Sequence, residues 1–416
     1  MLNVHDQHFL TILCAAIRGR QAQIQEPLSA EDWKNICKRA QIHHVLPLIF
    51  EAVYHIPALQ DSAFTATKQQ VRQQIMFQTM KTHDFLELNH HLQEQGVKPL
   101  VVKGIVCREL YPRPDHRISG DEDLLISPQQ FGRCHEAMEA FGMEPAEPEA
   151  DLAAAHEIPY RKKNSNLYIE LHKYLFPPES EAYGDLNRFF EGAFVRAEME
   201  TFQGESVLTM APTDHLFYLI CHSLKHFLHS GFGIRQVCDI ILFAERYGHR
   251  IDWEQILENC REIRAEKFAA AVFRIGEKYL EFDTSAACYP DAWRRIAINE
   301  MAMLGDLLDS GIYGGAELSR KHSSTITLTA AAAQKQGTKS PNGLMASLFP
   351  PVDSMKKRYP YLTKYPYLLP VAWGSRLVQY GKEIRNSNDN SAVEAVKIGN
   401  QRIALMKEYG ILDDKT

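Results

Sequence analysis

The segment 97–126 contains an apolar run that ends in glycine and, further along, two carboxylates one residue apart. The apolar run has the length of a strand, Gly104 introduces a short helix, and a second strand begins at Asp121. Successive side chains of a strand point to opposite faces, so Asp121 and Asp123 share a face, about 7 Å apart. Two carboxylates on one face can chelate a hard cation. The segment therefore predicts a metal-dependent site for phosphoryl or nucleotidyl transfer.

A third carboxylate lies in a predicted hairpin. Residues 156–161 and 167–173 have the character of strands, and the turn-forming residues 163–166 join them. In the second strand the leucine and isoleucine side chains occupy one face, while Glu170 and His172 occupy the other. Glu170 is therefore predicted to face out of the core as a metal ligand. His172 either orients a carboxylate or only packs against its neighbours.

Helical periodicity on both sides of these strands predicts an α+β fold, in which a small mixed β-sheet core is flanked by helices, with N-terminal and C-terminal helical regions. Low hydrophobicity around an alanine run predicts a connection without regular structure. The expected regions are an N-terminal helical bundle (1–96), the core sheet (97–210), a helical domain (211–312), a loop or poorly ordered connection (313–346) and a C-terminal helical tail (347–416).

The composition is that of an ordinary globular protein. The 416 residues carry a formal net charge of -6, which shows no overall bias toward nucleic acid. The chain has no signal-like start and no apolar run long enough to span a membrane, so we expect a cytoplasmic protein without a membrane partner. The 8 cysteines form no CxxC pair, so most are expected to be reduced and buried.

Several motifs follow one another in a fixed order. They are Val102-Lys103-Gly104, Tyr111-Pro112 with Arg117, Asp121-Glu122-Asp123-Leu124-Leu125-Ile126, Ile169-Glu170-Leu171-His172, Cys221-His222-Ser223-Leu224-Lys225-His226 with Asp239, and the aromatic-proline tail that ends at Leu369-Pro370. In this order the motifs resemble the uncharacterised nucleotidyltransferase family of bacteria, a branch of the polymerase-beta-like nucleotidyltransferase superfamily. The resemblance extends over nearly the whole chain.

The resemblance implies that Asp121, Asp123 and Glu170 are catalytic residues that hold one or two Mg²⁺ ions. The substrate would be an NTP, and its NMP would pass to the hydroxyl of an unidentified acceptor, a small molecule, sugar, protein or tRNA, with release of pyrophosphate. Glu170, or a water beside it, would help to deprotonate the acceptor. The sequence identifies neither the nucleotide nor the oligomeric state.

The remaining candidate residues would bind the nucleotide. The superfamily usually has Gly-Ser or Gly-Gly after the first strand, whereas this chain has Lys103-Gly104-Ile105, so Lys103 is expected to supply phosphate charge in place of the missing hydroxyl. Arg117 is expected to clamp the triphosphate or the acceptor, and Lys225 to reach a phosphate.

Three histidines, His222, His226 and His229, lie on one face of a predicted helix at i, i+4 and i+7. This spacing permits a zinc site, but the sequence lacks the HExxH glutamate, and packing against the sheet explains the spacing equally well.

Two other functions stay open. The altered glycine motif also fits a degenerate, non-catalytic protein that binds a nucleotide or a partner. A toxin–antitoxin-type enzyme that acts on tRNA or protein would require a basic groove beside Asp121, which the acidic net charge disfavours.

Overall fold

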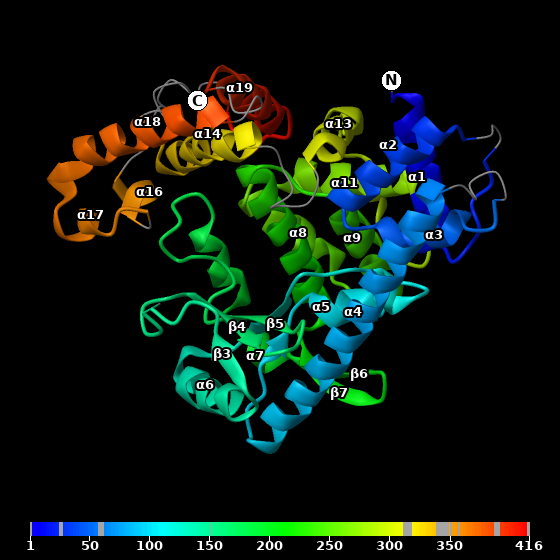
Figure 1. Ribbon diagram of the computed structural model, residues 1–416, viewed down its shortest axis with the longest axis horizontal. Helices are drawn as coiled ribbons and strands as arrows, with labels where there is room; N and C mark the ends of the chain where they lie inside the picture. The colour runs from blue at the N-terminus through cyan, green and yellow to red at the C-terminus, as the bar shows by residue number, and fades with distance from the viewer. Residues whose placement is uncertain are drawn as a thin grey trace.

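The computed structural model describes residues 2–24, 28–56, 62–149, 151–310, 318–337, 349, 352–356, 358–386 and 392–413. Within these ranges, no helix is both long enough and apolar enough to cross a membrane. Figure 1 shows a sheet region with helices on either side and helical segments at both ends of the chain. This arrangement confirms the predicted α+β class with a mixed sheet flanked by helices.

The N-terminal helices begin at residues that the sequence identifies as caps. The Ser29 hydroxyl accepts a hydrogen bond from the Asp32 amide at 3.1 Å, and the Asp32 carboxylate accepts one from the Ser29 amide at 2.9 Å. This reciprocal pair is a capping box. The long helix α4 then runs from the N-terminal helices to the sheet (Figure 1). The helices are α1 (Val4–Ile17), α2 (Ala30–Ile42), α3 (Leu46–Val53) and α4 (Ser62–Glu94).

The sheet has seven strands in the order β3-β4-β5-β2-β1-β7-β6. The pairs β1–β7 and β2–β5 are parallel, and the other neighbours are antiparallel. The predicted hairpin is confirmed as β4 and β5. The strands are β1 (Leu100–Val101), β2 (Glu122–Leu125), β3 (Met143–Pro145), β4 (Glu157–Lys162), β5 (Tyr168–His172), β6 (Glu198–Phe202) and β7 (Glu205–Thr209). The short helices between them are α5 (Gly104–Arg108), α6 (Phe131–Ala140) and α7 (Ala193–Arg196).

A helical region follows the sheet. Apolar spacing in the sequence predicts a second helix over residues 234–247, and the structure confirms these bounds. The third helix begins where Asp252 accepts a hydrogen bond from the Gln255 amide at 3.0 Å. The helices are α8 (Pro212–His229), α9 (Ile234–Tyr247), α10 (Trp253–Glu262), α11 (Glu266–Tyr279), α12 (Asp291–Arg294) and α13 (Glu300–Ser310).

The expected loop over 313–346 is wrong for its central part, because Leu318–Gln336 form helix α14. Alanines favour the helix, and Ile326 and Ala330 are buried. The side of α14 is also held by a hydrogen bond from the Thr327 hydroxyl to the Leu228 carbonyl at 2.6 Å. Small residues and a buried hydroxyl lower the hydrophobicity of the segment without preventing close packing, which misled the prediction.

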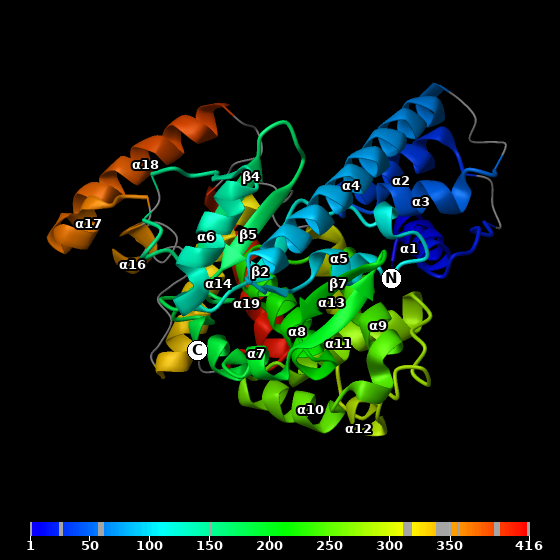
Figure 2. The same cartoon turned by 90° about the horizontal axis from the view of Figure 1, so that it is seen from below.

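The C-terminal region consists of α16 (Val352–Lys356), α17 (Tyr361–Lys364), α18 (Leu369–Asn386) and α19 (Ala392–Glu408). The sequence predicts a last helix over residues 392–409, and α19 confirms it; α19 packs along α14 (Figure 1). The sequence also predicts a break over 386–390, which lies, after its first residue, outside the described residues. Figure 2 shows α16, α17 and α18 at one edge of the molecule.

One contiguous apolar core runs from Phe9 in α1 to Leu412 after α19 and includes the sheet and α8. The predicted region boundaries therefore divide elements that share a core, and they stay predictions. All cysteines are free, and all are buried except Cys288, in agreement with the expectation for most of them.

The contact between α14 and α19 supplies a test of the packing. A Cβ atom added to Gly399 would lie 2.7 Å from Ile326 Cδ1 and 3.2 Å from its Cβ, so Gly399→Leu should destabilise the protein by about 1–3 kcal/mol. The same substitution at Gly305, where a Cβ meets no atom within 4 Å, should be neutral or stabilising. Urea unfolding of both variants measures the difference; equal stabilities would contradict the packing of α19 on α14.

Candidate active site

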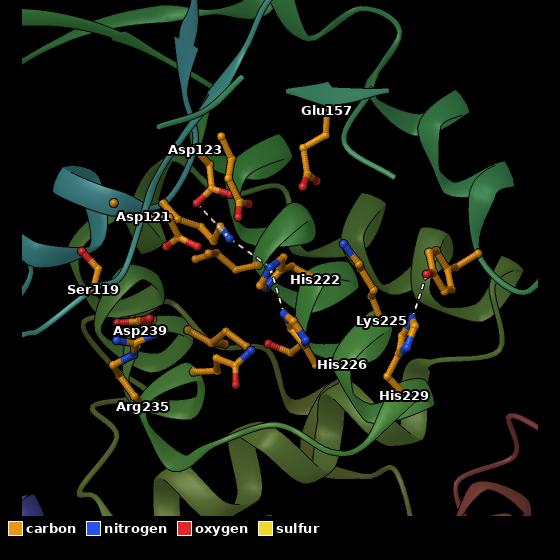
Figure 3. Close-up of a pocket in the computed structure, with 18 of the residues that line it drawn as sticks. Ser119, Asp121, Asp123, Glu157, His222, Lys225, His226, His229, Arg235 and Asp239 are labelled. Carbon is orange, nitrogen blue, oxygen red and sulfur yellow. Dashed lines mark hydrogen bonds and ion pairs between the residues drawn. The ribbon is translucent and has the colours of Figure 1, made fainter. Parts of the chain in front are cut away.

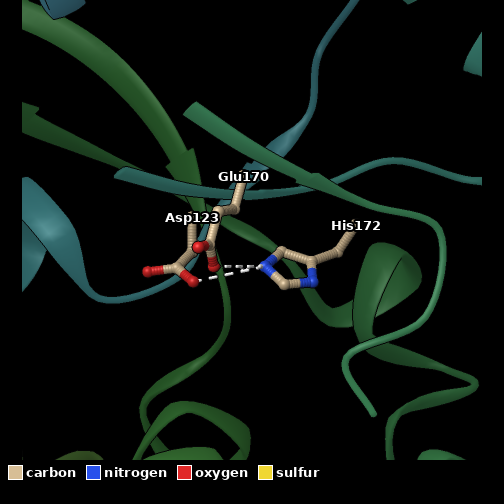
Figure 4. A group of neighbouring side chains, drawn as sticks. All are labelled: Asp123, Glu170 and His172. Carbon is tan, nitrogen blue, oxygen red and sulfur yellow. Dashed lines mark hydrogen bonds and ion pairs between the residues drawn. The ribbon is translucent and has the colours of Figure 1, made fainter. Parts of the chain in front are cut away.

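Two carboxylates meet where β2 and β5 pair. The parallel register places Asp123 opposite Glu170 and Leu125 opposite His172. One ligand atom from each of Asp123, Glu170 and His172 lies within 4.8 Å of the others (Figure 4). The structure therefore brings together two of the three predicted carboxylates and adds an imidazole. Asp121 precedes β2 and stands outside this cluster, although it lines the same cavity.

The imidazole of His172 bridges acidic groups. Its Nε2 lies 3.2 Å from Asp123 Oδ1 and 3.8 Å from Glu170 Oε2, while its Nδ1 lies 3.5 Å from Glu157 Oε2. His172 and Asp123 are both buried. Of the two sequence interpretations, the structure thus supports an orienting role for His172 over simple packing.

Lys103 occupies a strained turn between β1 and α5. Its φ of 84° is rare for a residue with a side chain. Its amide lies 3.3 Å from the His215 ring nitrogen Nε2. Burial and the charge of Lys103 lower the pKa of His215 to about 3, so the ring is neutral and its Nε2 can accept this hydrogen bond. The other ring nitrogen lies 3.3 Å from the Thr209 hydroxyl, which donates to the Val101 carbonyl at 2.7 Å. These contacts hold the strained turn in place.

The Lys103 ammonium contacts the carboxylate cluster. It lies 2.9 Å from Asp123 Oδ2 and 2.9 Å from His222 Nε2. Burial acts to lower the pKa of Lys103, but Asp123 and the other groups around it hold the pKa above its usual value. Burial raises and Lys103 lowers the pKa of Asp123, which is depressed overall, so this pair is ionised. In this structure Lys103 neutralises a carboxylate, and its predicted contact with phosphate stays a prediction.

Because residue 104 is a glycine, the Glu122 carboxylate can lie directly against the backbone of the turn. The sequence did not identify Glu122 as a functional candidate. Glu122 is completely buried; its Oε2 accepts a hydrogen bond from the Ile105 amide at 2.9 Å, and its Oε1 lies 2.5 Å from Arg108 Nη1. Lys81 of α4 lies 3.2 Å from the same Oε1. A Cβ on Gly104, whose φ is 44°, would lie 1.9 Å from Glu122 Oε2. Strand alternation alone could have indicated Glu122, because it must face away from its two aspartate neighbours.

Glu170 has an unusual protonation state. Burial, followed by the charges of Asp123 and Asp121, raises the pKa of Glu170 to about 8. Near neutral pH the carboxyl group is therefore largely protonated in the protein without a cation. A protonated carboxyl group beside an ionised one is a site where a bound cation can replace the proton.

A cavity of about 430 Å³ opens in front of the carboxylates and is bounded on one side by α8. Figure 3 shows Asp121, Asp123 and Glu157 on one side of it and His222, Lys225 and His226 on the other. Its lining residues come from the turn between β1 and α5, the segment before β2, β2, the start of β4, β5, the segment after β5, α8 and α9. They include Lys103, Gly104, Arg117, Ser119, Asp121, Asp123, His156, Glu157, Glu170, Tyr183, His222, Lys225, His226, His229, Arg235 and Asp239. Such a volume suits a small-molecule ligand.

The cavity-facing side of α8 carries nitrogen groups. His222 and His226 have their Nε2 atoms 3.1 Å apart, and His229 Nε2 lies 2.7 Å from the Tyr183 hydroxyl. Burial, then neighbouring cations, lowers the pKa of His222 and of His226 well below the usual value, so both rings are neutral. Among the described residues, the cluster of three potential metal ligands contains none of these histidines.

Lys225 projects from α8 toward the cavity (Figure 3). Burial lowers its pKa, and the nearest acidic influences are Glu157 and Glu170. In the described part of the chain, no carboxylate lies within ion-pair distance of its ammonium. The cavity thus holds a partly buried cation that an anionic ligand could neutralise.

Arg117 also lines the cavity, where it is paired with Asp239. Its Nε and Nη2 lie 2.7 and 2.6 Å from the two carboxylate oxygens of Asp239, which also accepts a hydrogen bond from the Tyr111 hydroxyl at 2.8 Å. All three side chains are buried. The structure therefore gives Arg117 a bidentate structural partner, and its role as a substrate clamp stays a prediction.

Comparison with known proteins agrees with this geometry. The family described as uncharacterised nucleotidyltransferase matches residues 29–281. The chain belongs to this family. The match includes every residue that lines the cavity and ends after α11, so it covers less of the chain than the resemblance in sequence, which reached Leu369-Pro370. No curated protein and no solved structure matched.

The cluster of Asp123, Glu170 and His172 fits a divalent cation on its own chemistry. Carboxylate oxygens suit Mg²⁺ and Mn²⁺, and an imidazole nitrogen suits Mn²⁺ better than Mg²⁺. The ammonium of Lys103 already occupies one side of Asp123, which shows that positive charge is favoured there. Asp123, Glu170 and His172 are the residues that could hold the ion.

Cation binding should release a proton from Glu170. Because its pKa is about 8, close to one proton should leave per Mn²⁺ bound at pH 7, and almost none at pH 9. The apparent affinity should rise about tenfold per pH unit below 8 and level off above it. Calorimetric titration with Mn²⁺ in buffers of different ionisation enthalpy measures the released protons. Glu170→Gln should abolish the release; an unchanged release in this variant would assign the proton to another group.

Proposed function

We propose that this protein is a divalent-cation-dependent nucleotidyltransferase that moves an NMP from an NTP to an acceptor hydroxyl in the cytoplasm. The observation that carries the proposal is the pairing of Asp123 with Glu170 across two parallel strands, in a cavity whose opposite wall carries cations. Family membership supports the reaction class.

The chemistry requires one bond to form and one to break. The acceptor oxygen bonds to the α-phosphorus of the NTP, the bond from that phosphorus to the bridging oxygen breaks, and pyrophosphate leaves with the electron pair. Mg²⁺, when bound, would neutralise phosphate charge and orient the two oxygens. Asp123 and Glu170 would hold the ion, Asp121 would complete the predicted carboxylate set, and His172 would fix the orientation of Asp123.

The acceptor proton requires a base. Glu170 is proposed to take it directly or through a water, after the cation has displaced the proton that this carboxyl group carries in the protein without a cation. The same carboxyl group is proposed as a ligand. Loss of this proton would therefore be required both for cation binding and for deprotonation of the acceptor.

Lys225 is proposed to bind the phosphates. Its ammonium is partly buried, lines the cavity and faces the carboxylates from the opposite wall. Lys103, now 2.9 Å from Asp123, is proposed to contribute a second positive charge when phosphate is present. The neutral rings of His222 and His226 can donate or accept hydrogen bonds without adding charge.

A non-catalytic nucleotide-binding protein is the second candidate, and the glycine turn favours it. The Ile105 amide is bonded to Glu122 at 2.9 Å, and the Lys103 amide faces His215. Two amides of the turn that could have bound a phosphate are therefore already used inside the protein. On this alternative, the chain would bind an NTP without releasing pyrophosphate.

Removal of either paired carboxylate should abolish transfer. Asp123→Asn and Glu170→Gln should each lower the rate of pyrophosphate release by at least about a hundredfold, since both would weaken cation binding. The assay uses each α-labelled NTP with Mg²⁺ and a cell extract as the source of acceptor, and it identifies the labelled product. Glu144→Gln, on the exposed surface of β3, is the control and should retain the wild-type rate. Tight NTP binding without any release would favour the non-catalytic alternative.

Lys225→Met should weaken NTP binding about tenfold and leave Mn²⁺ binding unchanged, because the lysine is proposed to contact phosphate and cannot itself ligate a cation. Calorimetric titration with ATP, GTP, CTP and UTP measures the effect for each nucleotide. Lys98→Met, at an exposed lysine outside the cavity, is the matched control. If the two variants bind NTP with equal affinity, Lys225 does not contact the phosphates.

A further inference from the structure

The segment 354–382 differs in charge from the rest of the chain. It contains six lysines and arginines and no aspartate or glutamate, in a protein whose net charge is -6. It also contains five tyrosines and one tryptophan. The segment lies beyond residues 29–281, so the family comparison assigns nothing to it.

This segment forms an arm with its own small core. Buried Met355, Leu362 and Ala372 make a cluster separate from the main core, and Leu369 and Trp373 pack against it. Figures 1 and 2 both show α17 and the start of α18 at the edge of the molecule, away from the sheet and α8. The arm therefore presents a surface that the main body does not cover.

That surface carries an apolar stripe. Val371 and Val378 are two turns apart on one face of α18, with side chains 61% and 63% exposed, and Tyr367 before them is 73% exposed. Gly374, between the two valines on this face, is small and exposed. Val371 and Val378 do not pack in the small core of the arm, because α18 contributes Ala372 and Trp373 to that core from another side of the helix.

The arm also carries exposed cations. Arg358 and Lys364 are exposed, and the Lys364 ammonium lies 5.6 Å from the centre of the Tyr365 ring. Tyr365 and Tyr367 are in edge contact, with ring centres 5.9 Å apart, at the turn between α17 and α18. Tyrosines beside lysines and aliphatic side chains are typical of a protein surface that lies in the interface of a bilayer.

We propose that this arm binds the surface of an anionic lipid membrane, with Tyr367, Val371 and Val378 in the interface and Arg358 and Lys364 against the headgroups. Charge complementarity identifies the occupant, because residues 352–386 carry seven lysines and arginines against two carboxylates, Asp353 and Glu383, and anionic lipid attracts such an excess of positive charge. The exposed valines distinguish this ligand from RNA, which is bound through cations and stacked aromatic rings and gains little from aliphatic groups. Binding to a membrane surface does not require a helix that crosses the membrane, and the described residues contain none. The arm would thus bring the protein to a membrane.

The arm is joined to the cavity wall through its neighbours in the chain. Helices α14 and α19 precede and follow it, and they hold the carboxyl end of α8. Arg402 of α19 donates to the His229 carbonyl at 2.5 Å, and Arg320 of α14 donates to the Ser230 carbonyl at 2.5 Å. The arm therefore lies in the chain between the two helices that hold the carboxyl end of α8, the helix that carries Lys225.

Vesicle sedimentation of the full-length protein tests the proposal. Vesicles of phosphatidylcholine mixed with phosphatidylglycerol should bind the protein at least about tenfold more tightly than vesicles of phosphatidylcholine alone. The double variant Val371→Asp, Val378→Asp should lose about tenfold in affinity for the mixed vesicles, and Lys364→Glu should lose affinity mainly at low salt. Val195→Asp, at a valine of α7 that is 91% exposed and outside the arm, is the matched control and should bind as the wild type does.

Several outcomes would overturn the proposal. One is an absence of binding to mixed vesicles at low salt, and another is equal loss from Val195→Asp. If single-stranded RNA binds more tightly than vesicles and the valine variant binds it normally, the arm is an RNA surface. If the valine variant instead converts a dimer to a monomer in gel filtration, the stripe is an interface between two copies of this chain. Circular dichroism of each variant confirms that the helices are intact.

Discussion

A completely buried carboxylate, Glu122, joins the sheet to the helices on which the cavity depends. A buried charge without partners is strongly unfavourable, but Glu122 has Arg108 of α5, Lys81 of α4 and the Ile105 amide around it. Burial acts to raise the pKa of Glu122, while Arg108 and Lys81 lower it below its usual value, so the charge is retained. The approach of this carboxylate to the α5 turn leaves no room for a side chain at residue 104, which explains the glycine there. The neighbouring Lys103 then adopts its positive φ and directs its ammonium toward Asp123.

The two walls of the cavity differ in charge: one is formed by the sheet and the other by α8. The sheet supplies the carboxylates, since strand alternation turns Glu122 inward and Asp123 outward, and the parallel register sets Glu170 opposite Asp123. Helix α8 supplies the nitrogen groups, because its residues at i, i+3 and i+4 face one direction. An NTP with bound cation carries both signs of charge, and a cavity with one acidic and one basic wall is complementary to it.

The part of the chain beyond the family match contributes to this cavity indirectly. The last carbonyls of α8 have no intrahelical partners, and arginines from α14 and α19 bond to them. Cations at a helix carboxyl end are favoured by the helix dipole as well. The close packing of Gly399 on Ile326 keeps α19 against α14, so the two arginines act from one rigid pair of helices. Helix α8 is thereby fixed at the sheet end by His215 and at its other end by residues outside the family region.

The sequence by itself determined the local features of this protein. Periodicity and turn-forming residues predicted α9 and the 156–172 hairpin in agreement with the structure, and alternation along β5 correctly separated Glu170 from the core. It failed for α14, whose small buried residues carry little hydrophobic signal. The tertiary structure decided which distant groups meet: His172 in place of Asp121 beside the carboxylate pair, Asp239 around Arg117, and Lys81 beside Glu122. Local patterns fix which face a side chain occupies, whereas strand register and helix docking fix its partners, and these depend on residues far apart in the chain.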